Sequence, residues 1–400
     1  MTLLDKSCFL IISGMPFVYL FNSFYKFELS DISFRVADIF IAVCFLILEI
    51  QVIQRNRIDK MLLFYLTVVL SLTLITIFGL LISDKFDNDW SRDLHFYETM
   101  FLAPLAYVYL NTKSKMETFI KNVMISGLIM SFVSIYLFFT NPELHRIAGY
   151  VSYAGGEGLD KQASFNEWGS IYAIILCVIF YELIKNGTIT KYKIFTFIIV
   201  SAGMVLVQSR SAIFSIIIVV SVLFYEKFKS IFTGKISKKL VKSILFTIFA
   251  FVLTIIAYKF LTINRFSDTF KPGSNAYLSM SSRFKLWDLG ITLLFDQLGM
   301  TFIGHGNNYF LENTGSVSSD NFYLDHMISS GVIGITIIMY FFLYPALKLR
   351  KRGLLKPNSN PCILIVLIGL IVSITGNVLV DPMYGGTTFA LSYAYLSNSE

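Results

Sequence analysis

Apolar runs of about 20 residues recur along the whole 400-residue chain and constrain its fold more than any other feature. A helix of ~20 residues crosses the ~30 Å hydrocarbon layer of a membrane. Apolar residues make up 55% of the chain and charged residues only 15%, more apolar surface than a soluble domain can bury. The sequence therefore predicts a single, all-α integral membrane domain over 1–400.

We expect about twelve membrane-spanning helices, because that many apolar runs are long enough to cross the bilayer. The first run has no small-residue cleavage site, so we interpret it as a retained span. The expected spans are 7–25, 36–53, 61–83, 95–110, 118–140, 165–184, 193–208, 211–228, 241–261, 321–346, 361–380 and 386–397.

Lysines and arginines gather in alternate loops, for example 227–242 and 348–356. The positive-inside rule puts these loops and both termini in the cytoplasm, so topology explains the +7 net charge and no nucleic-acid partner is expected. Two outer loops are long, 141–164 and 262–320. The second should be partly helical, with Ser282 as its cap.

The cysteines and histidines give no sign of a metal centre. All four cysteines lie within apolar runs without a C-x-x-C pair, and the four histidines are scattered over four segments. No nucleotide-binding P-loop and no common hydrolase motif occurs. We therefore expect neither a metal nor a cofactor, and neither a nucleotide-driven pump nor a familiar hydrolase.

Arg210 is the most informative charged residue, because it lies between two apolar runs with no room for a loop. A charge at such depth is costly and normally faces a partner or a polar cavity. The guanidinium fork suits a phosphate or pyrophosphate, although a snorkelling arginine at a tight turn is the alternative. Arg283 is a second candidate, or else a surface arginine at a helix start. Arg146 and Arg265 are weaker candidates.

Asp320 and Asn321 open the tenth expected span. The simplest role for this position is a helix N-cap. The functional alternative is a general base beside a helix N-terminus that favours a bound anion. His326 follows within two turns and is another candidate base. His305, between two glycines, is a candidate base on a mobile loop.

Seven short motifs occur in order between about 145 and 345. They are RIAG (146–149), FNEWGS (165–170), QSRSA (208–212), SSRFKLW (281–287), FIGHGNNYF (302–310), SDNFYL (319–324) and SGVIG (330–334). In this order they resemble motifs of the O-antigen ligase/polymerase family. Each motif is short, and the ordered set carries the resemblance.

The resemblance implies a metal-independent, inverting glycosyltransferase with a GT-C-like fold. It would act at the outer face of the bacterial inner membrane on an oligosaccharide carried by undecaprenyl pyrophosphate. Arg210 and Arg283 would hold the pyrophosphate, and Asp320 or His326 would act on the acceptor. The substrate would also contact a second set of residues: Arg146, Tyr150, Tyr153, Asn166, Arg265, Trp287, His305, Asn321 and Tyr323.

One departure from the family bears on the reaction. Ligases carry His-Asn before Tyr-Leu, where this chain has Asp320-Asn321. The missing histidine favours a repeat-unit polymerase of the Wzy type over a ligase. The resemblance also implies membrane lipid, a chain-length regulator and a flippase as partners. A ligase, a flippase for lipid-linked oligosaccharides and a purely structural membrane protein remain the alternatives.

Overall fold

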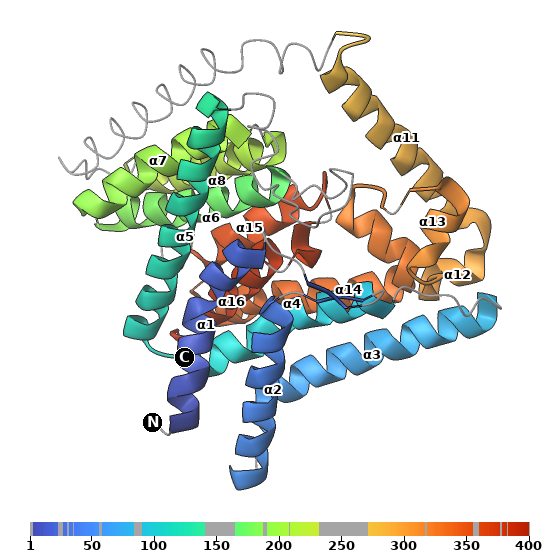
Figure 1. Ribbon diagram of the computed structural model, residues 1–400, viewed down its shortest axis with the longest axis horizontal. Helices are drawn as coiled ribbons and strands as arrows, with labels where there is room; N and C mark the ends of the chain where they lie inside the picture. The colour runs from blue at the N-terminus through green and yellow to red at the C-terminus, as the bar shows by residue number, and fades with distance from the viewer. Residues whose placement is uncertain are drawn as a thin grey trace.

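A computed structural model gives the fold of the chain (Figure 1). The expected outer loop 141–164 and the expected span 241–261 lie outside the residues that the structure describes. The described residues are 3–22, 27–29, 32–34, 36–55, 58–83, 90–140, 165–186, 190–207, 209–231, 271–316, 318–354, 360–376, 378–381 and 383–399.

The first half of the chain is built from long helices and one short hairpin. Strands β1 (Phe27–Leu29) and β2 (Ile32–Phe34) pair antiparallel between the first two helices. The helices are α1 (Leu3–Asn22), α2 (Val36–Arg55), α3 (Lys60–Ser83), α4 (Trp90–Tyr109), α5 (Lys113–Thr140), α6 (Phe165–Asn186), α7 (Lys191–Val207) and α8 (Arg210–Ile231).

Helices also dominate the second half, including the described part of the long loop 262–320, where partial helicity was predicted and is confirmed by α11, α12 and α13. The elements are α11 (Asn275–Asp296), α12 (Leu298–Ile303), α13 (Asn308–Thr314), α14 (Phe322–Lys351), α15 (Cys362–Val372), the 3-10 turn η2 (Val378–Val380) and α16 (Tyr384–Ser397).

Within the described part of the chain, six helices are long and apolar enough to cross a membrane: α1, α2, α3, α5, α6 and α14. Large apolar side chains on α2 and α3 are exposed: Leu46, Leu70 and Phe78 are each more than half exposed. Such a surface suits lipid rather than water. The chain is thus a helical, membrane-embedded protein, while the number of twelve spans stays a prediction.

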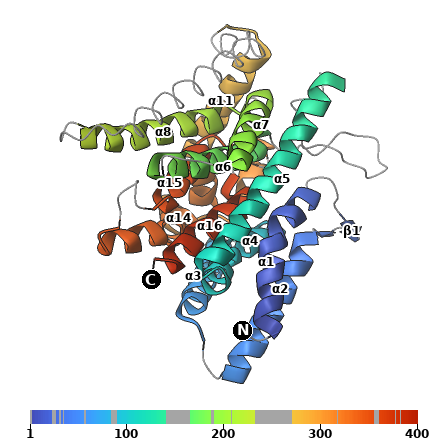
Figure 2. The same ribbon diagram turned by 90° about the vertical axis from the view of Figure 1, so that its left-hand side faces the viewer.

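The other expected spans within the described residues are also helical, but α15 is short. It ends at Val372, not at residue 380, and a turn and η2 follow it. Helix α16 occupies the centre of the molecule, where it packs against α4, α15, α14 and α6, and nearly all its residues are buried. Helices α1, α2 and α5 run roughly upright in Figure 1, whereas α3 and α4 run across. Figure 2 shows α1 and α2 side by side with α5.

Helix α14 is broken at Gly331, whose φ of 67° and ψ of −176° belong to a region open essentially to glycine. Because of the break, carbonyl groups just before Gly331 lack their usual N–H donors from the next turn of the helix. Backbone N–H groups of a neighbouring loop replace them: His305 donates to Ile328 (2.8 Å) and Gly306 donates to Ser329 (2.9 Å). The backbone is therefore satisfied within the protein, as a membrane interior requires.

The two segments at this joint touch backbone to backbone. A Cβ on Gly331 would lie 2.2 Å from the carbonyl oxygen of Phe302, and a Cβ on Gly304 would lie 2.3 Å from that of Ser329. Glycine is thus required on both sides of the contact. The joint fixes the loop 304–306 against α14, and so positions the start of α14 relative to α12 and α13.

Replacing Gly331 with alanine should lower the thermal unfolding temperature of the detergent-solubilised protein. The substitution combines a backbone conformation that costs about 1–3 kcal/mol with a steric clash at Phe302. Gly14→Ala is the control, because Gly14 is helical and has open space around it. That variant should be as stable as the parent or slightly more stable. Equal unfolding temperatures for both variants would contradict the joint.

Candidate functional site

The first turn of α14 is fixed by contacts to its own cap and to the end of α15. Asn321 is the N-cap, and its Oδ1 accepts hydrogen bonds from the backbone N–H groups of Tyr323 (3.0 Å) and Leu324 (3.1 Å). The N–H of Phe322 donates to the Ser373 carbonyl at 3.0 Å, just beyond α15. The Tyr323 hydroxyl donates to the Leu370 carbonyl at 2.7 Å. The last turn of α15 and its C-cap thus supply carbonyls that hold the start of α14.

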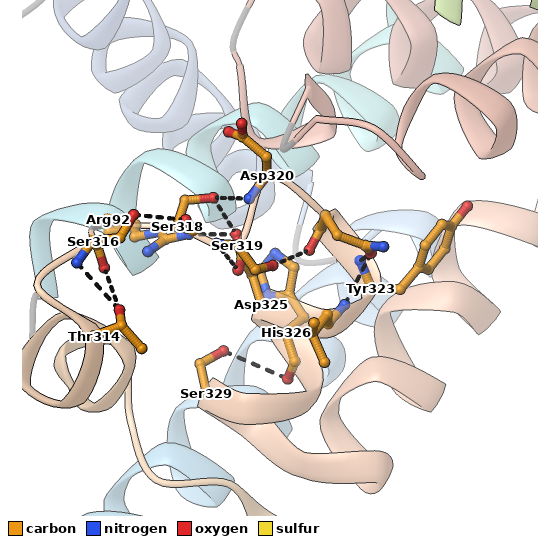
Figure 3. Close-up of polar contacts among 12 residues, drawn as sticks. Arg92, Thr314, Ser316, Ser318, Ser319, Asp320, Tyr323, Asp325, His326 and Ser329 are labelled. Carbon is orange, nitrogen blue, oxygen red and sulfur yellow. Dashed lines mark hydrogen bonds and ion pairs between the residues drawn. The ribbon is translucent and has the colours of Figure 1, made fainter. Parts of the chain in front are cut away.

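Asp325, one turn into α14, is buried and its carboxylate is surrounded by donors (Figure 3). Ser318 Oγ donates to Oδ2 at 2.6 Å, and the Ser319 backbone N–H donates to Oδ1 at 2.8 Å. Arg92, in the first turn of α4, pairs with Oδ2 at 3.4 Å. A buried carboxylate is costly without such partners. Asp325 therefore ties the loop 318–320 and the start of α4 to the same turn of α14.

Asp320 points away from this buried network in Figure 3. It has a left-handed backbone, with φ of 57°, and its N–H donates to Ser318 Oγ at 3.0 Å. Its Oδ2 accepts a hydrogen bond from Nε of Arg283 at 3.0 Å, and this ion pair joins the loop to α11. The side chain of Asp320 is 47% exposed and that of Arg283 is 19% exposed. The pair lies at the surface of the site, directly before the N-terminus of α14.

The Arg283–Asp320 pair has unused bonding capacity. Among the residues that the structure describes, Arg283 makes its ion pair through Nε alone, so both terminal nitrogens are left for another acceptor. Within the same part of the chain, Oδ1 of Asp320 accepts no hydrogen bond. A guanidinium fork and a carboxylate oxygen are the groups that hold an anion and a hydroxyl group, respectively.

Two expectations about this region are corrected. The N-cap of α11 is Ser274, whose Oγ accepts from the Tyr277 N–H at 3.1 Å, and not Ser282, which lies inside the helix. The N-cap of α14 is Asn321, which leaves Asp320 free of that role. Asn321 was expected to contact substrate, but its side-chain oxygen accepts the hydrogen bonds of the cap.

His326 is buried, unlike a base that must reach an acceptor. Its ring packs against Phe96 and Phe322 at centroid distances of 4.8 and 4.4 Å. Its Nε2 has no hydrogen-bond partner among the described residues. The ring therefore fills an aromatic layer under the site, and Asp320 is the more accessible candidate base.

Two other candidate residues are also packed rather than open. His305 is buried and its ring stacks on that of Tyr309, with the ring centroids 3.9 Å apart. Trp287 does share a face of α11 with Arg283, but it packs against a small buried cluster that includes Phe310 and Leu324. Its indole nitrogen is buried without a partner among the described residues. Both rings therefore pack inside the protein next to the site.

Arg210 is the first residue of α8 and is half-buried. Ser209 before it is fully buried against Gly169 of α6, where an added Cβ would lie 2.4 Å from the Ser209 Cβ. Helix α8 packs on α6 and α15, whereas Arg283 lies on α11, which packs on α12, α13 and α14. Because α15 also holds the start of α14, it connects the helix of Arg210 to the Asp320 loop.

The remaining expected site residues are not shown to contact the Arg283–Asp320 pair. Asn166 lies near the start of α6. Four of them lie outside the described residues: Arg146, Tyr150, Tyr153 and Arg265. Arg92 and Ser318, by contrast, belong to the site and were not predicted. A buried carboxylate at residue 325 requires a cation and a donor, but the sequence does not show which of many would reach it.

Comparison with known proteins adds one finding. No protein-family model matches the chain, and no curated protein is significantly similar to it in sequence.

The Arg92–Asp325 pair should show strong energetic coupling in a double-mutant cycle of Arg92→Gln and Asp325→Asn. Each single change removes the opposite charge next to a partly buried one, so we expect a coupling energy of about 1–3 kcal/mol in detergent. Thermal or chemical unfolding of the four proteins measures it.

The exposed pair Lys113–Glu117, at 3.9 Å, is the matched control and should couple by less than ~0.5 kcal/mol. Additive effects of Arg92→Gln and Asp325→Asn would show that Asp325 does not depend on Arg92.

Proposed function

We propose that this protein is a membrane-embedded glycosyltransferase that elongates a polysaccharide, with the Arg283–Asp320 pair at its active site. The observation that carries the proposal is the ion pair itself. It sets a guanidinium, whose two terminal nitrogens have no partner among the described residues, beside a half-exposed carboxylate at a helix N-terminus in a membrane protein. Such a group of charges suits a substrate that combines a pyrophosphate, a hydroxyl group and a lipid.

Arg283 would bind the pyrophosphate of the sugar donor. Its Nε remains with Asp320, so the plane of the guanidinium is fixed and the two terminal nitrogens point as one fork. Holding the fork in place before the substrate arrives lowers the entropy cost of binding. As the glycosidic bond breaks, negative charge develops on the departing pyrophosphate. A fixed cation there stabilises the transition state more than the ground state.

Asp320 would act on the acceptor hydroxyl group. One carboxylate oxygen is held by Arg283, and the other is available to accept a hydrogen bond from the hydroxyl group. The left-handed backbone of Asp320 turns this carboxylate away from the buried network, toward the exposed side. The same carboxylate thus orients the arginine and the attacking oxygen relative to each other.

The reaction would be a single displacement at the anomeric carbon. The acceptor oxygen forms a bond to that carbon while the bond from the carbon to the pyrophosphate oxygen breaks, which inverts the configuration. The hydroxyl proton passes to Asp320, and undecaprenyl pyrophosphate leaves with the bonding electrons. The donor is the growing chain and the acceptor is one lipid-linked repeat unit.

Arg210 would provide a second cation for the same anion. It lies at the N-terminus of α8, where backbone N–H groups also favour negative charge. Its helix packs on α15, which in turn holds the start of α14, so this part of the proposal is tested separately.

The resemblance to O-antigen polymerases supplies the setting of the proposal. By this resemblance the chain would lie in the bacterial inner membrane, with about twelve spans, a GT-C-like fold, cytoplasmic termini and an active site that faces the periplasm. A flippase that delivers repeat units and a chain-length regulator are the proposed partners. The donor carries its own activated bond, so no nucleotide sugar is needed on that face.

Arg283→Lys should abolish polymer ladders in a strain that depends on this protein, with unchanged protein level in the membrane. Lysine keeps the charge but loses the fork, and loss of one such donor typically lowers the rate by ~10²–10³-fold. Lys285→Ala is the control, because it removes an exposed cation two residues away on the same helix. Full ladders from Arg283→Lys would overturn the proposal.

Asp320→Asn and Arg210→Lys test the two remaining roles in the same strain. The amide introduced by Asp320→Asn would keep a hydrogen-bond acceptor but could not take a proton, so we expect loss of ladders. Retained ladders would leave Asp320 as an anchor for Arg283 only. Retained ladders in Arg210→Lys would remove the second cation from the mechanism. Ladders that persist but no longer join a lipid core would identify a ligase instead.

A further inference from the structure

Three metal-ligating side chains meet between α2 and α4, apart from the Arg283–Asp320 pair. Asp38 lies in the first turn of α2, and His95 and Glu98 lie three residues apart on α4. Nδ1 of His95 is 3.2 Å from Oε2 of Glu98 and 3.9 Å from Oδ1 of Asp38. One donor atom from each residue lies within 4.8 Å of the other two.

These separations suit a shared metal ion. Zinc binds imidazole nitrogen at ~2.0–2.1 Å and carboxylate oxygen at ~2.0–2.2 Å, mostly with tetrahedral geometry. Two ligands on such an ion are then roughly 3.4 Å apart. The two measured distances bracket this value, so small rotations of the Asp38 and Glu98 side chains would bring all three donors onto one ion.

The surroundings make a cation favourable at this position. All three side chains are mostly buried, with exposures between 11% and 19%. The carboxylates of Asp38 and Glu98 bring like charges together in a poorly solvated place, where a cation between them would be stabilising. The dipole of α2 helps to stabilise Asp38, but Glu98 lies beyond the first turn of α4, where that effect has faded.

We propose that Asp38, His95 and Glu98 bind one divalent transition-metal ion, of which Zn²⁺ is the best match. Imidazole favours zinc over magnesium or calcium, and three protein ligands leave one position for water. The ion would tie α2 to α4. It would not take part in sugar transfer, and the proposal does not depend on that function.

The site would also steady the neighbouring charge network. Arg92 lies one turn before His95 on α4 and pairs with Asp325, and Phe96 packs on His326. A metal ion that fixes this part of α4 to α2 would therefore stabilise the contacts that α4 makes with α14.

Isothermal titration of the purified full chain in detergent, after treatment with a chelator, tests the site. ZnCl₂ should bind with one equivalent per chain, and MgCl₂ should not displace it. His95→Gln, Asp38→Asn and Glu98→Gln should each weaken this binding by at least ~10-fold. Glu117→Gln, which changes an exposed carboxylate on α5, is the control and should bind as the parent does.

A thermal shift gives a second readout on the same proteins. Zn²⁺ should raise the unfolding temperature of the parent and of Glu117→Gln, because a ligand that binds only the folded state stabilises it. Glu98→Gln should fold and show no such rise. Absence of stoichiometric zinc binding in the parent, or unchanged binding in His95→Gln and Glu98→Gln, would overturn the proposal and leave the cluster as a histidine–carboxylate ion pair.

Discussion

The buried carboxylate of Asp325 sets the geometry around it, because an ionised group in an apolar interior must be surrounded by donors. Three of the groups that contact it come from different places: a hydroxyl and a backbone N–H from the loop before α14, and a guanidinium from α4. Satisfying one side chain therefore fixes the position of two segments. The loop 318–320 has little freedom once Ser318 and Ser319 are committed to Asp325.

The left-handed conformation of Asp320, at the end of that loop, accompanies the same hydrogen-bond network. Ser318 donates to Asp325 and accepts from the N–H of Asp320, which places Asp320 in a left-handed conformation. Asn321 then caps α14, so two neighbouring polar residues take opposite roles. One faces the helix and the other faces outward to Arg283. The exposed ion pair is thus supported by a buried network directly beneath it.

The break in α14 gives the site its second support. Where a helix is interrupted in an apolar environment, its carbonyls need hydrogen bonds from other donors. The backbone N–H groups of the loop 304–306 supply these hydrogen bonds. Glycines on both sides allow the two backbones to touch. The loop and α14 are thus in direct contact, and beside them His305 stacks on Tyr309 while Trp287 packs against the cluster that contains Phe310 and Leu324.

The sequence determined the general class of this protein, because apolar runs of membrane-spanning length leave lipid as the only suitable solvent. Periodicity also placed a helix around Arg283 and put Trp287 on the same face. These are local properties, since the spacing of residues along one helix fixes their directions.

Only the tertiary structure decided which side chains meet. Arg283 and Asp320 are 37 residues apart in sequence, and Arg92 and Asp325 are 233 apart. Asp38 reaches His95 and Glu98 only because α2 packs on α4, so four scattered histidines gave no hint of that cluster. The reason is physical: ion pairs and metal ligands depend on distances of a few ångströms between elements, and packing sets those distances rather than local sequence.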